Sequence, residues 1–411
     1  MRQVPSEPTR AYLLLEHYRN DIERCVKCGS CGSVCPTLQC ERDESFSARG
    51  RMALVKAVLD NRLALSSLFK DRLATCTTCG ACEASCPSAV PVTTIIQAAK
   101  EQAVAESGMG IIQSVIASTV KHPALFRAAA WLAPLVLHYT QGRGRPSAFP
   151  SQRSGRRAIV STGQTRRGTV AFFPGCAIDH FQQDIGRSTT AVLNAIGFDV
   201  VVPAGLQCCG RPLLSLGDRK GAEELAAHNA ALFSGLDVDA IVTACASCGL
   251  TFKQDYPRLL RPGTKNPAVF DIHEFLAGRV AGFLVNSVSK RVTVHDPCHL
   301  GRGQGLSRTV RDLLRAVSGL TLVEMKNADR CCGFGGVMRI THRDLSDGIA
   351  EAKVKNIIAS NADLVATGCP GCRMQIADAL KRQGSEIDVV HTVQILEAAV
   401  CTSGDRTDGR S

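Results

Sequence analysis

Residues 25–36 read CVKCGSCGSVCP, and residues 76–87 read CTTCGACEASCP. Both stretches follow the pattern C-x2-C-x2-C-x3-C-P. Four thiolates at this spacing are typical of [4Fe–4S] binding, and in two-cluster ferredoxins the fourth cysteine of each run ligates the other cluster. Zinc is disfavoured, because four-cysteine zinc sites use two separated C-x2-C pairs. The expected ligands are Cys25, Cys28, Cys31 and Cys86 for one cluster, and Cys76, Cys79, Cys82 and Cys35 for the other.

The composition is that of an ordinary globular protein. The chain has 411 residues, 45% of them hydrophobic and 21% charged, which predicts about two or three domains. It contains 20 cysteines, and its N-terminus lacks the apolar segment of a signal peptide. Disulfides suit short secreted chains, so we expect a reduced cytoplasmic compartment in which the thiols are kept for metal.

No apolar run approaches the roughly 20 residues that a membrane-spanning helix requires. The nearest is residues 128–137, AAAWLAPLVL, which Pro134 interrupts. We interpret it as a buried helix between the two halves of the chain. The alternative is a segment lying in a membrane interface, which would place the protein peripherally on the cytoplasmic face of the inner membrane.

The net charge of +11 favours acidic partners, but it does not indicate nucleic acid. Seven arginines fall within residues 143–167, a stretch rich in glycine and serine. Nucleic-acid surfaces interleave basic residues with aromatic ones, and only 5% of this chain is aromatic. The stretch is therefore predicted to be a solvated linker.

The rest of the chain is a repeat. Its first copy has the pattern C-x31-CC-x35-C-x2-C and its second C-x32-CC-x36-C-x2-C, with matching cysteines 122 to 124 residues apart. The cysteines are Cys176, Cys208, Cys209, Cys245 and Cys248 in the first copy, and Cys298, Cys331, Cys332, Cys369 and Cys372 in the second.

Short β-rich runs precede each group of cysteines, and helical stretches lie between them. The predicted strands are 170–173, 200–202 and 240–242, then 292–294, 320–323 and 364–366; the helices that precede each C-x2-C are 222–234 and 345–359. Alternating strands and helices predict a parallel sheet in each copy. Ligands of such sheets gather beyond the carboxyl ends of the strands, where all the repeated cysteines fall.

These patterns predict an α+β multidomain fold, with a helical two-[4Fe–4S] ferredoxin domain followed by two tandem α/β domains with parallel sheets. In the first domain, apolar stripes predict helices over 11–24 and 52–63. The expected boundaries are 1–108 for the ferredoxin domain, 109–169 for a helical segment and basic linker, 170–285 and 286–401 for the two cysteine-rich domains, and 402–411 for a disordered tail.

The repeated cysteines point to a metal site, with structural thiols or a redox disulfide as the alternative. Adjacent cysteines pair poorly, because disulfide geometry requires Cα atoms farther apart than neighbours allow. His180, His295 and His299 lie near these cysteines, where they could supply hydrogen bonds or protons or simply pack.

Outside the repeat, four basic residues lie close to the first cysteine run in sequence. Arg24, Lys27, Arg49 and Arg51 could raise a cluster's potential or merely face solvent. Cys40 and Cys401 fit no pattern and are expected to be ordinary thiols. No dinucleotide-binding fingerprint or phosphate-binding loop occurs, so we expect no nucleotide, flavin or catalytic residues in this chain.

With these motifs in place, the chain resembles the iron–sulfur subunit of glycolate oxidase and D-lactate dehydrogenase complexes. The resemblance covers nearly the whole chain: two C-x2-C-x2-C-x3-C-P runs, then two cysteine-rich CCG domains. The wider group is similar to the small subunit of anaerobic glycerol-3-phosphate dehydrogenase and to heterodisulfide reductase subunits. In heterodisulfide reductases the CCG motifs hold noncubane [4Fe–4S] clusters, which implies one or two further clusters here, bound by the five cysteines of each copy.

The resemblance also implies a function. In this family a partner FAD subunit oxidises a 2-hydroxy acid, and electrons then pass through the iron–sulfur subunit to quinone or another acceptor. Some glycolate oxidase subunits have lost part of the CCG pattern, whereas this chain keeps every cysteine, so the substrate stays open. The alternatives are an electron carrier of the glycerol-3-phosphate type and a catalytic subunit in which a CCG cluster cleaves a disulfide.

Overall fold

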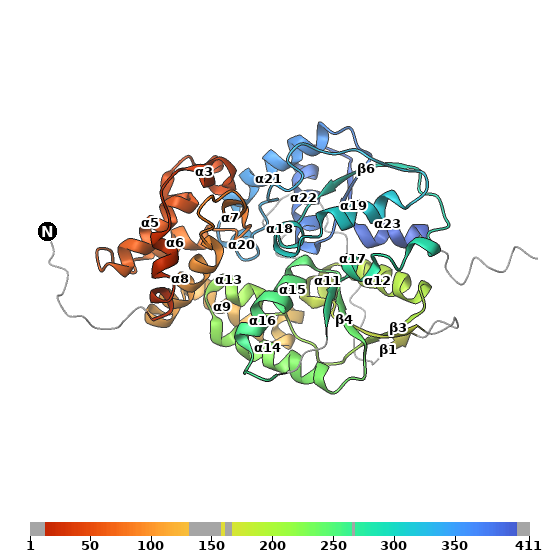
Figure 1. Ribbon diagram of the computed structural model, residues 1–411, viewed down its shortest axis with the longest axis horizontal. Coiled ribbons are helices and arrows are strands. Elements are labelled where there is room, and N and C mark those ends of the chain that lie inside the picture. The colour runs from red at the N-terminus through yellow and green to blue at the C-terminus, as the bar shows by residue number, and fades with distance from the viewer. Residues whose placement is uncertain (1–12, 131–157, 161–166, 265–267, 401–411) are drawn as a thin grey trace, which may run out of the picture.

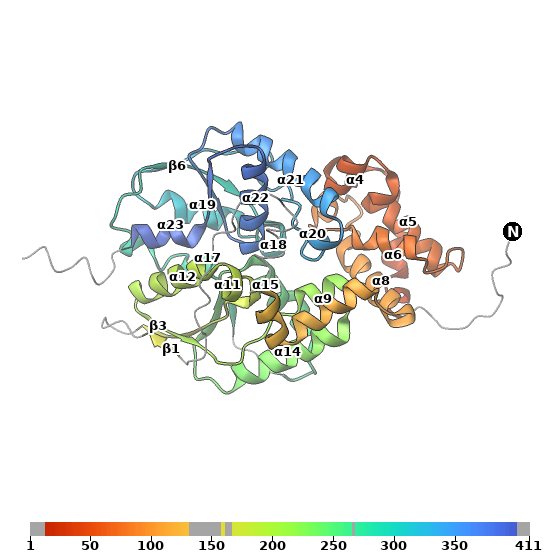
Figure 2. The same cartoon turned by 180° about the vertical axis from the view of Figure 1, so that it is seen from behind.

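The computed structural model describes residues 13–130, 158–160, 167–264 and 268–400 (Figure 1). A helical N-terminal lobe lies beside two lobes that each contain a sheet, and the reverse view in Figure 2 shows the same arrangement. We call them the ferredoxin lobe, the first CCG lobe and the second CCG lobe. Residues 131–137 of the apolar run and the tail 402–411 lie outside the described residues.

The ferredoxin lobe is built of short helices that leave the cysteine runs in the loops between them. Its helices are α1 (Leu13–Glu16), α2 (Arg19–Glu23), α3 (Ser30–Val34), α4 (Pro36–Glu41), α5 (Ala48–Leu59), α6 (Ser67–Ala74), α7 (Ala81–Ala84) and α8 (Val92–Ser107), with a 3-10 turn at Glu44–Phe46. Ser47 and Ser66 cap α5 and α6 by accepting hydrogen bonds from backbone N–H groups of the first turn. Helix α9 (Ile111–Lys121) then leads away towards the first CCG lobe.

Two details of the predicted helices in this lobe are wrong. The single helix expected over 11–24 is two helices, because the chain leaves helical geometry at Tyr18 (φ −104°, ψ 9°). Leu15 is fully buried, while the backbone N–H of Leu14 donates to the Gln102 side chain on α8. The stripe expected to reach Leu63 ends with α5 at Leu59.

The first CCG lobe is a sheet of β1 (Ala158–Val160), β2 (Gly168–Phe172), β3 (Phe198–Val202), β4 (Ala240–Thr243) and β5 (Val269–Asp271) in the order β1-β3-β2-β4-β5. All neighbours are parallel except β1, which pairs antiparallel with β3. Its helices are α11 (Gly175–Phe181), α12 (Gln183–Ala195), α13 (Arg211–Leu216), α14 (Arg219–Ser234), α15 (Ala246–Leu250), α16 (Tyr256–Leu259) and α17 (Ile272–Leu276), with a π-helical turn at Thr251–Asp255.

The second CCG lobe repeats this plan. Its strands β6 (Lys290–His295), β7 (Leu320–Leu322), β8 (Leu364–Thr367) and β9 (Asp388–His391) are all parallel, in the order β7-β6-β8-β9. Its helices are α18 (Cys298–Gln304), α19 (Ser307–Arg315), α20 (Met338–Thr341), α21 (Arg343–Ile358), α22 (Pro370–Arg382) and α23 (Thr392–Ala399), and a 3-10 turn at Ala281–Phe283 joins the lobes.

The predicted parallel sheets are confirmed, but three strands were missed. β5 and β9 add a fourth parallel strand to each sheet, and β1 lies inside the stretch predicted to be linker. β1 and β5 are only three residues long, and β9 begins with Asp388 in a polar stretch, so none shows a clear strand pattern in the sequence.

The three lobes pack directly against one another. Between the CCG lobes, Arg373 forms an ion pair with Asp184 (2.7 Å), and Gln182 donates to the Pro370 carbonyl oxygen (2.8 Å). The ferredoxin lobe approaches the first CCG lobe so closely at Gly217 (φ +86°) that a Cβ there would lie 2.5 Å from the Lys100 carbonyl oxygen. A glycine is required at that contact.

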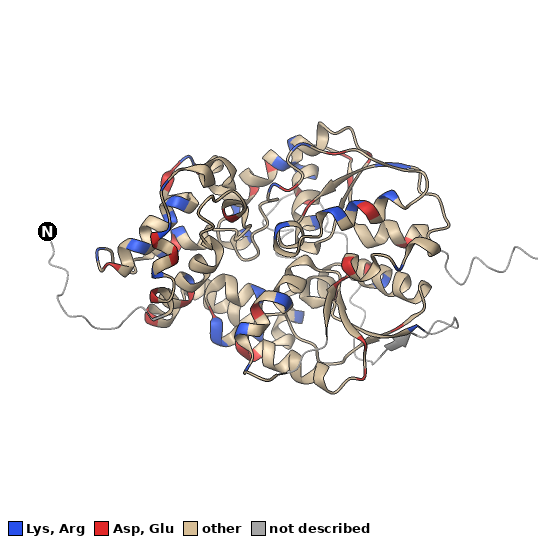
Figure 3. Cartoon of the chain, in the orientation of Figure 1, with Lys and Arg blue, Asp and Glu red and all other residues tan. Residues whose placement is uncertain are grey.

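Basic and acidic residues are interspersed over all three lobes, as Figure 3 shows. Among the described residues, no single helix has the length and hydropathy of a membrane span. Helices α8 and α9 have the required length and hydropathy only when they are taken together, and they are bent by 106° where they meet.

Candidate iron–sulfur sites

We assign the eighteen cysteines of the motifs to four candidate sites, which follow the ligand sets expected from the sequence and are named in chain order. Site 1 is Cys25, Cys28, Cys31 and Cys86; site 2 is Cys35, Cys76, Cys79 and Cys82; site 3 is Cys176, Cys208, Cys209, Cys245 and Cys248; site 4 is Cys298, Cys331, Cys332, Cys369 and Cys372. All of them have free thiols. In both CCG lobes the cysteines follow the carboxyl ends of parallel strands, the edge where such sheets bind ligands.

Site 1 lies at the surface. Cys82 and Cys86 from the second run line the same cavity as the first three cysteines of the first run, and Cys86 is the one expected as the exchanged fourth ligand. Cys28 is exposed, and a hydrogen bond with the Ser30 hydroxyl (3.4 Å) lowers the pKa of its thiol. Arg49 donates to the Lys27 carbonyl oxygen in this loop, so it is a cation held beside site 1.

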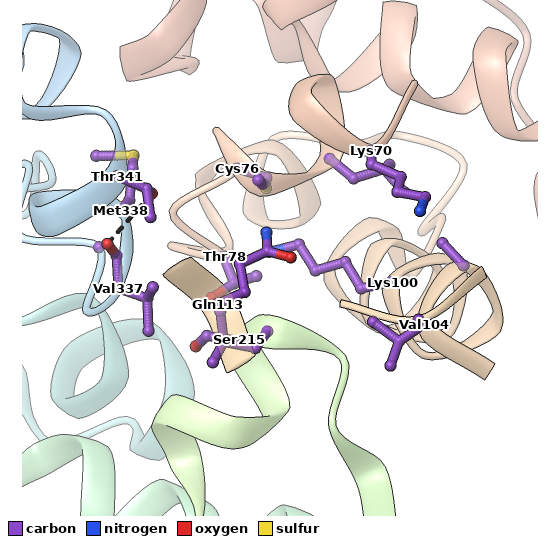
Figure 4. A pocket seen from close by; sticks show the side chains of 16 residues that line it. Lys70, Cys76, Thr78, Lys100, Val104, Gln113, Ser215, Val337, Met338 and Thr341 are labelled. Atoms are coloured by element: carbon purple, nitrogen blue, oxygen red, sulfur yellow. Dashed lines mark hydrogen bonds between the residues drawn. The ribbon is translucent and has the colours of Figure 1, made fainter. Parts of the chain in front are cut away.

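Site 2 is more deeply placed. Burial raises the pKa of the Cys82 thiol, and the neighbouring Cys76, Cys79 and Cys35 raise it further, which shows that thiols from both runs meet here. Lys100 projects from α8 into a cavity that Cys76 also lines (Figure 4). Burial lowers the pKa of Lys100 to about 8, and the nearby Cys76 opposes this shift.

Arg51 is buried beside site 2 and does not face solvent. It is fully buried and donates to the Arg72 carbonyl oxygen (2.7 Å) and to the hydroxyls of Thr37 and Thr75. Thr37 follows Cys35 by two residues and Thr75 directly precedes Cys76. One guanidinium group therefore hydrogen-bonds to residues next to both cysteine runs.

Site 3 gathers five thiols from three loops. The Sγ atoms of Cys176 and Cys208 are 3.6 Å apart, and the Cys209 thiol lies near those of Cys208 and Cys248. Gly175 (φ +67°) allows this approach, because a Cβ there would lie 2.8 Å from the Cys248 sulfur.

Site 4 has the same arrangement with a different surrounding. Sγ of Cys332 is 3.4 Å from Sγ of Cys372, and the Cys298 thiol lies near that of Cys331. Lys353, fully buried on α21, donates to the carbonyl oxygens of Asn327 (2.6 Å) and Ala328 (3.1 Å). Burial lowers its pKa to about 8, against the opposing effect of the site 4 thiols.

Two contacts join these sites across lobe boundaries. Cys79 of site 2 lies near Cys331 of site 4, and this neighbouring thiol together with burial raises the pKa of Cys79. Cys245 of site 3 likewise lies near Cys369 of site 4, so that each thiol affects the pKa of the other. Arg302 supports the first contact, because its Nε donates to the Cys79 carbonyl oxygen (2.9 Å). The sites therefore succeed one another in the order 1, 2, 4, 3.

The three histidines flagged in the sequence have different surroundings. His299 is held between Ser247 (2.8 Å) and Arg211 (3.4 Å), and burial lowers its pKa to about 3. His180 packs against Phe126, with ring centroids 4.9 Å apart. Neither ring nitrogen of His295 has a hydrogen-bond partner within the described residues.

The buried lysines Lys100 and Lys353 were missed by sequence reasoning, although each occupies an apolar helical stripe where a charge is unusual. Ile96 and Ala103 flank Lys100, and Ile349 and Ile357 flank Lys353. Cys40, expected to be an ordinary thiol, packs where α4 meets α21, and Cys401 lies outside the described residues.

The residues present fit iron–sulfur groups. Each site offers at least four thiols within a small volume, and thiolates are the ligands that such clusters require. Buried cations lie beside sites 2 and 4, where they compensate the negative charge of ligating thiolates.

Comparisons with known proteins agree with this chemistry. Residues 21–90 match the 4Fe-4S dicluster domain family, and residues 170–253 and 292–377 match the CCG cysteine-rich domain family. The dicluster match establishes two [4Fe–4S] clusters, and the CCG matches indicate additional noncubane clusters.

Three curated relatives are similar along most of their length. A subunit of the fumarate reductase (CoM/CoB) of Methanothermobacter marburgensis is 32% identical, over 92% of this chain and 72% of that protein. A probable glycolate oxidase iron–sulfur subunit of Bacillus subtilis is 29% identical, over 92% and 94%. A subunit of the dihydromethanophenazine:CoB–CoM heterodisulfide reductase of Methanosarcina barkeri is 28% identical, over 92% and 94%.

All three relatives are named as subunits of oxidoreductases, and the dicluster and CCG domains occur here in the predicted order. The chain belongs to the family of iron–sulfur electron-transfer subunits that join a two-[4Fe–4S] domain to two CCG domains, the family of the glycolate oxidase iron–sulfur subunit.

Proposed function

We propose that this chain is the iron–sulfur subunit of a flavin-dependent 2-hydroxy-acid dehydrogenase of the glycolate oxidase or D-lactate dehydrogenase type. It receives electrons from a partner FAD subunit and delivers them to quinone or another acceptor. Iron–sulfur clusters, when bound, accept and release single electrons. The observation that carries the proposal is the unbroken succession of thiol sites through the Cys79–Cys331 and Cys245–Cys369 contacts.

The ligand sets of this proposal are the four sites as defined above, and the domains are those expected from the sequence. Sites 1 and 2 each use four cysteines, exchanged between the runs at Cys35 and Cys86. Sites 3 and 4 each use five. The support is that each set gathers thiols that are far apart in sequence into one place.

The surface position of site 1 supports its role as the place where a redox partner docks. Cys28 is exposed, and the neighbouring Val26 has 69% of its surface accessible, an unusual position for a valine. Sites 2 and 4 are shielded by the contacts between lobes. A partner can therefore approach site 1 more closely than the interior sites.

Co-purification tests the proposal directly. The chain should be isolated anaerobically with its partners, the flavin content measured, and the oxidation of glycolate, D-lactate and glycerol 3-phosphate followed with a dye acceptor. We expect bound FAD and dye reduction by one of the two hydroxy acids. A complex without flavin that reduces no dye with any substrate contradicts the proposal, whereas activity with glycerol 3-phosphate alone favours the related glycerol-3-phosphate type.

A cavity favours a second candidate, a catalytic subunit of the heterodisulfide reductase type. The cavity has a volume of about 380 Å³ and is lined by residues of all three lobes. Cys298 of site 4 and Cys79 of site 2 reach it, together with Arg302. Two further cations of the lining, Arg211 and Arg258, are paired with Asp255, and Glu83 also lines the cavity. A small anionic molecule could approach site 4 through this space.

Reduction assays separate the two candidates. The anaerobically purified chain, reduced with a low-potential dye, should be offered small anionic disulfides while dye oxidation is followed. The catalytic candidate predicts turnover that is lost when Arg302→Leu removes a cation of the cavity. The electron-transfer candidate predicts no turnover of these disulfides at any concentration.

A further inference from the structure

His295 lies beside the cysteines of site 4, and the corresponding residue beside site 3 is apolar. It ends strand β6 and is 1% exposed. One of its ring nitrogens and the Sγ atoms of Cys332 and Cys372 all lie within 4.8 Å of one another. Imidazole and thiolates within this distance form a donor set suited to iron or zinc.

Within the described residues the imidazole has no hydrogen-bond partner of standard geometry, although the backbone of Ala328 lies near it. Neither nitrogen makes a hydrogen bond within the described residues, although the side chain is buried. The nearby Ala328 carbonyl oxygen already accepts from the backbone N–H of Asp296 (3.0 Å) and from Lys353 (3.1 Å). A buried polar group without a partner is destabilising, so the ring is expected to be satisfied by something the protein binds.

The repeat supplies an internal comparison. His295 corresponds to Phe173, because the two lie 122 residues apart, as do Cys298 and Cys176. Phe173 is fully buried and packs edge-on against Phe252, with ring centroids 4.8 Å apart. The same backbone position at the end of the central strand therefore carries a hydrocarbon ring in site 3 and a free imidazole in site 4.

We propose that His295 is a sixth donor of site 4, its imidazole nitrogen coordinating iron alongside the five thiols. Site 4 is then a mixed histidine and cysteine site, whereas site 3 is bound by thiols alone. This inference rests on the proposed ligand set of site 4 but not on the identity of the flavin partner.

Pulsed EPR of the reduced, full-length protein tests the proposal. The protein is produced anaerobically with isotopically labelled histidine, so that a coordinated imidazole gives a nitrogen hyperfine coupling that changes with the isotope. We expect this coupling in the unmodified chain and its loss in His295→Phe, which copies the first half. His299→Gln is the matched control, because both nitrogens of His299 already have partners, and it should keep the coupling.

Iron counts keep the test decisive if His295→Phe binds metal poorly. His295→Cys supplies another donor, so it should restore the iron that His295→Phe loses while showing no nitrogen coupling. Cys332→Ala, which removes about four irons if site 4 is loaded, identifies the signal of that site. The proposal is overturned if loaded site 4 shows no labelled-nitrogen coupling or if the coupling survives in His295→Phe. If Cys332→Ala loses no iron, site 4 is unloaded and the proposed ligand set fails with it.

Discussion

The two CCG lobes have one architecture and two different interiors. Helices α14 and α21 correspond at an offset of 124 residues, and each supplies one buried polar side chain that supports the loop of the double cysteine. In the first lobe this residue is Asn229, which accepts from the Gln207 N–H (3.0 Å) and donates to the Cys208 carbonyl oxygen (3.1 Å). In the second lobe it is Lys353.

The two lobes therefore share one arrangement of strands and helices, but the second carries a buried positive charge beside its candidate metal site, site 4. Asn229 and Lys353 both satisfy backbone groups of the loop, but only Lys353 brings a positive charge into a buried place. A buried cation favours the more negative, reduced state of a neighbouring cluster. The charge of Lys353 therefore predicts that electrons collect at site 4 before site 3.

Removing one thiol from each site should give the largest effect. Cys209→Ala and Cys332→Ala should each lose about four irons per chain, because each cysteine holds a separate cluster. The expected consequences differ: without site 4, site 3 should no longer be reduced through the ferredoxin lobe, whereas without site 3, site 4 should still be reduced. Iron and sulfide analysis with reduction followed by EPR measures both. Equal reduction of the surviving site in both variants would contradict the order 1, 2, 4, 3.

Replacing Lys353 and Asn229 in turn by apolar residues separates the effect of charge from that of hydrogen bonding. Lys353→Met should lower the reduction potential of site 4, because it removes the buried charge. It should also cost about 1–3 kcal/mol of unfolding free energy, because the Asn327 and Ala328 carbonyl oxygens each lose one of their two donors. Asn229→Leu serves as the control: a similar loss of stability is expected from its unpaired backbone groups, with a smaller change in the potential of site 3. Redox titration and denaturant unfolding distinguish the two effects, and equal potential shifts would refute the role of charge.

The contact between the ferredoxin lobe and site 4 can be weakened without touching a thiol. Arg302 corresponds to His180 at the same offset of 122 residues, yet Arg302 reaches the Cys79 carbonyl oxygen while His180 packs on Phe126. Arg302→Leu should slow the reduction of site 4 several-fold with iron content unchanged, and His180→Leu should not. Rapid-mixing kinetics of anaerobically reduced protein measure the rates, and identical rates in both variants would exclude Arg302 from this contact.

Most of the fold followed from the cysteine spacing and the alternation of strands and helices, because these are local patterns. The strands that were missed, β1, β5 and β9, are short and are defined by their neighbours in the sheet. At the sites, the sequence separates Cys79 from Cys331 and Cys245 from Cys369, and only the packing of lobes brings each pair together. The roles of Lys353 and His295 also depend on burial, which a lone lysine or histidine in a sequence does not reveal.

The smallest effects are expected at the N-cap residues that precede α14 and α21, because the two copies of the repeat differ there. Asp218 caps α14 by accepting from the Gly221 N–H (2.9 Å), whereas His342 makes no cap on α21 and instead contacts Asp71 of the ferredoxin lobe (3.0 Å). Asp218→Ala should therefore cost about 1 kcal/mol of unfolding free energy through the lost cap. His342→Ala should cost less, about 0–1 kcal/mol, because its contact is partly solvated. Denaturant unfolding of both variants checks the ranking, and a larger loss for His342→Ala would show that lobe docking contributes more to stability than helix capping does.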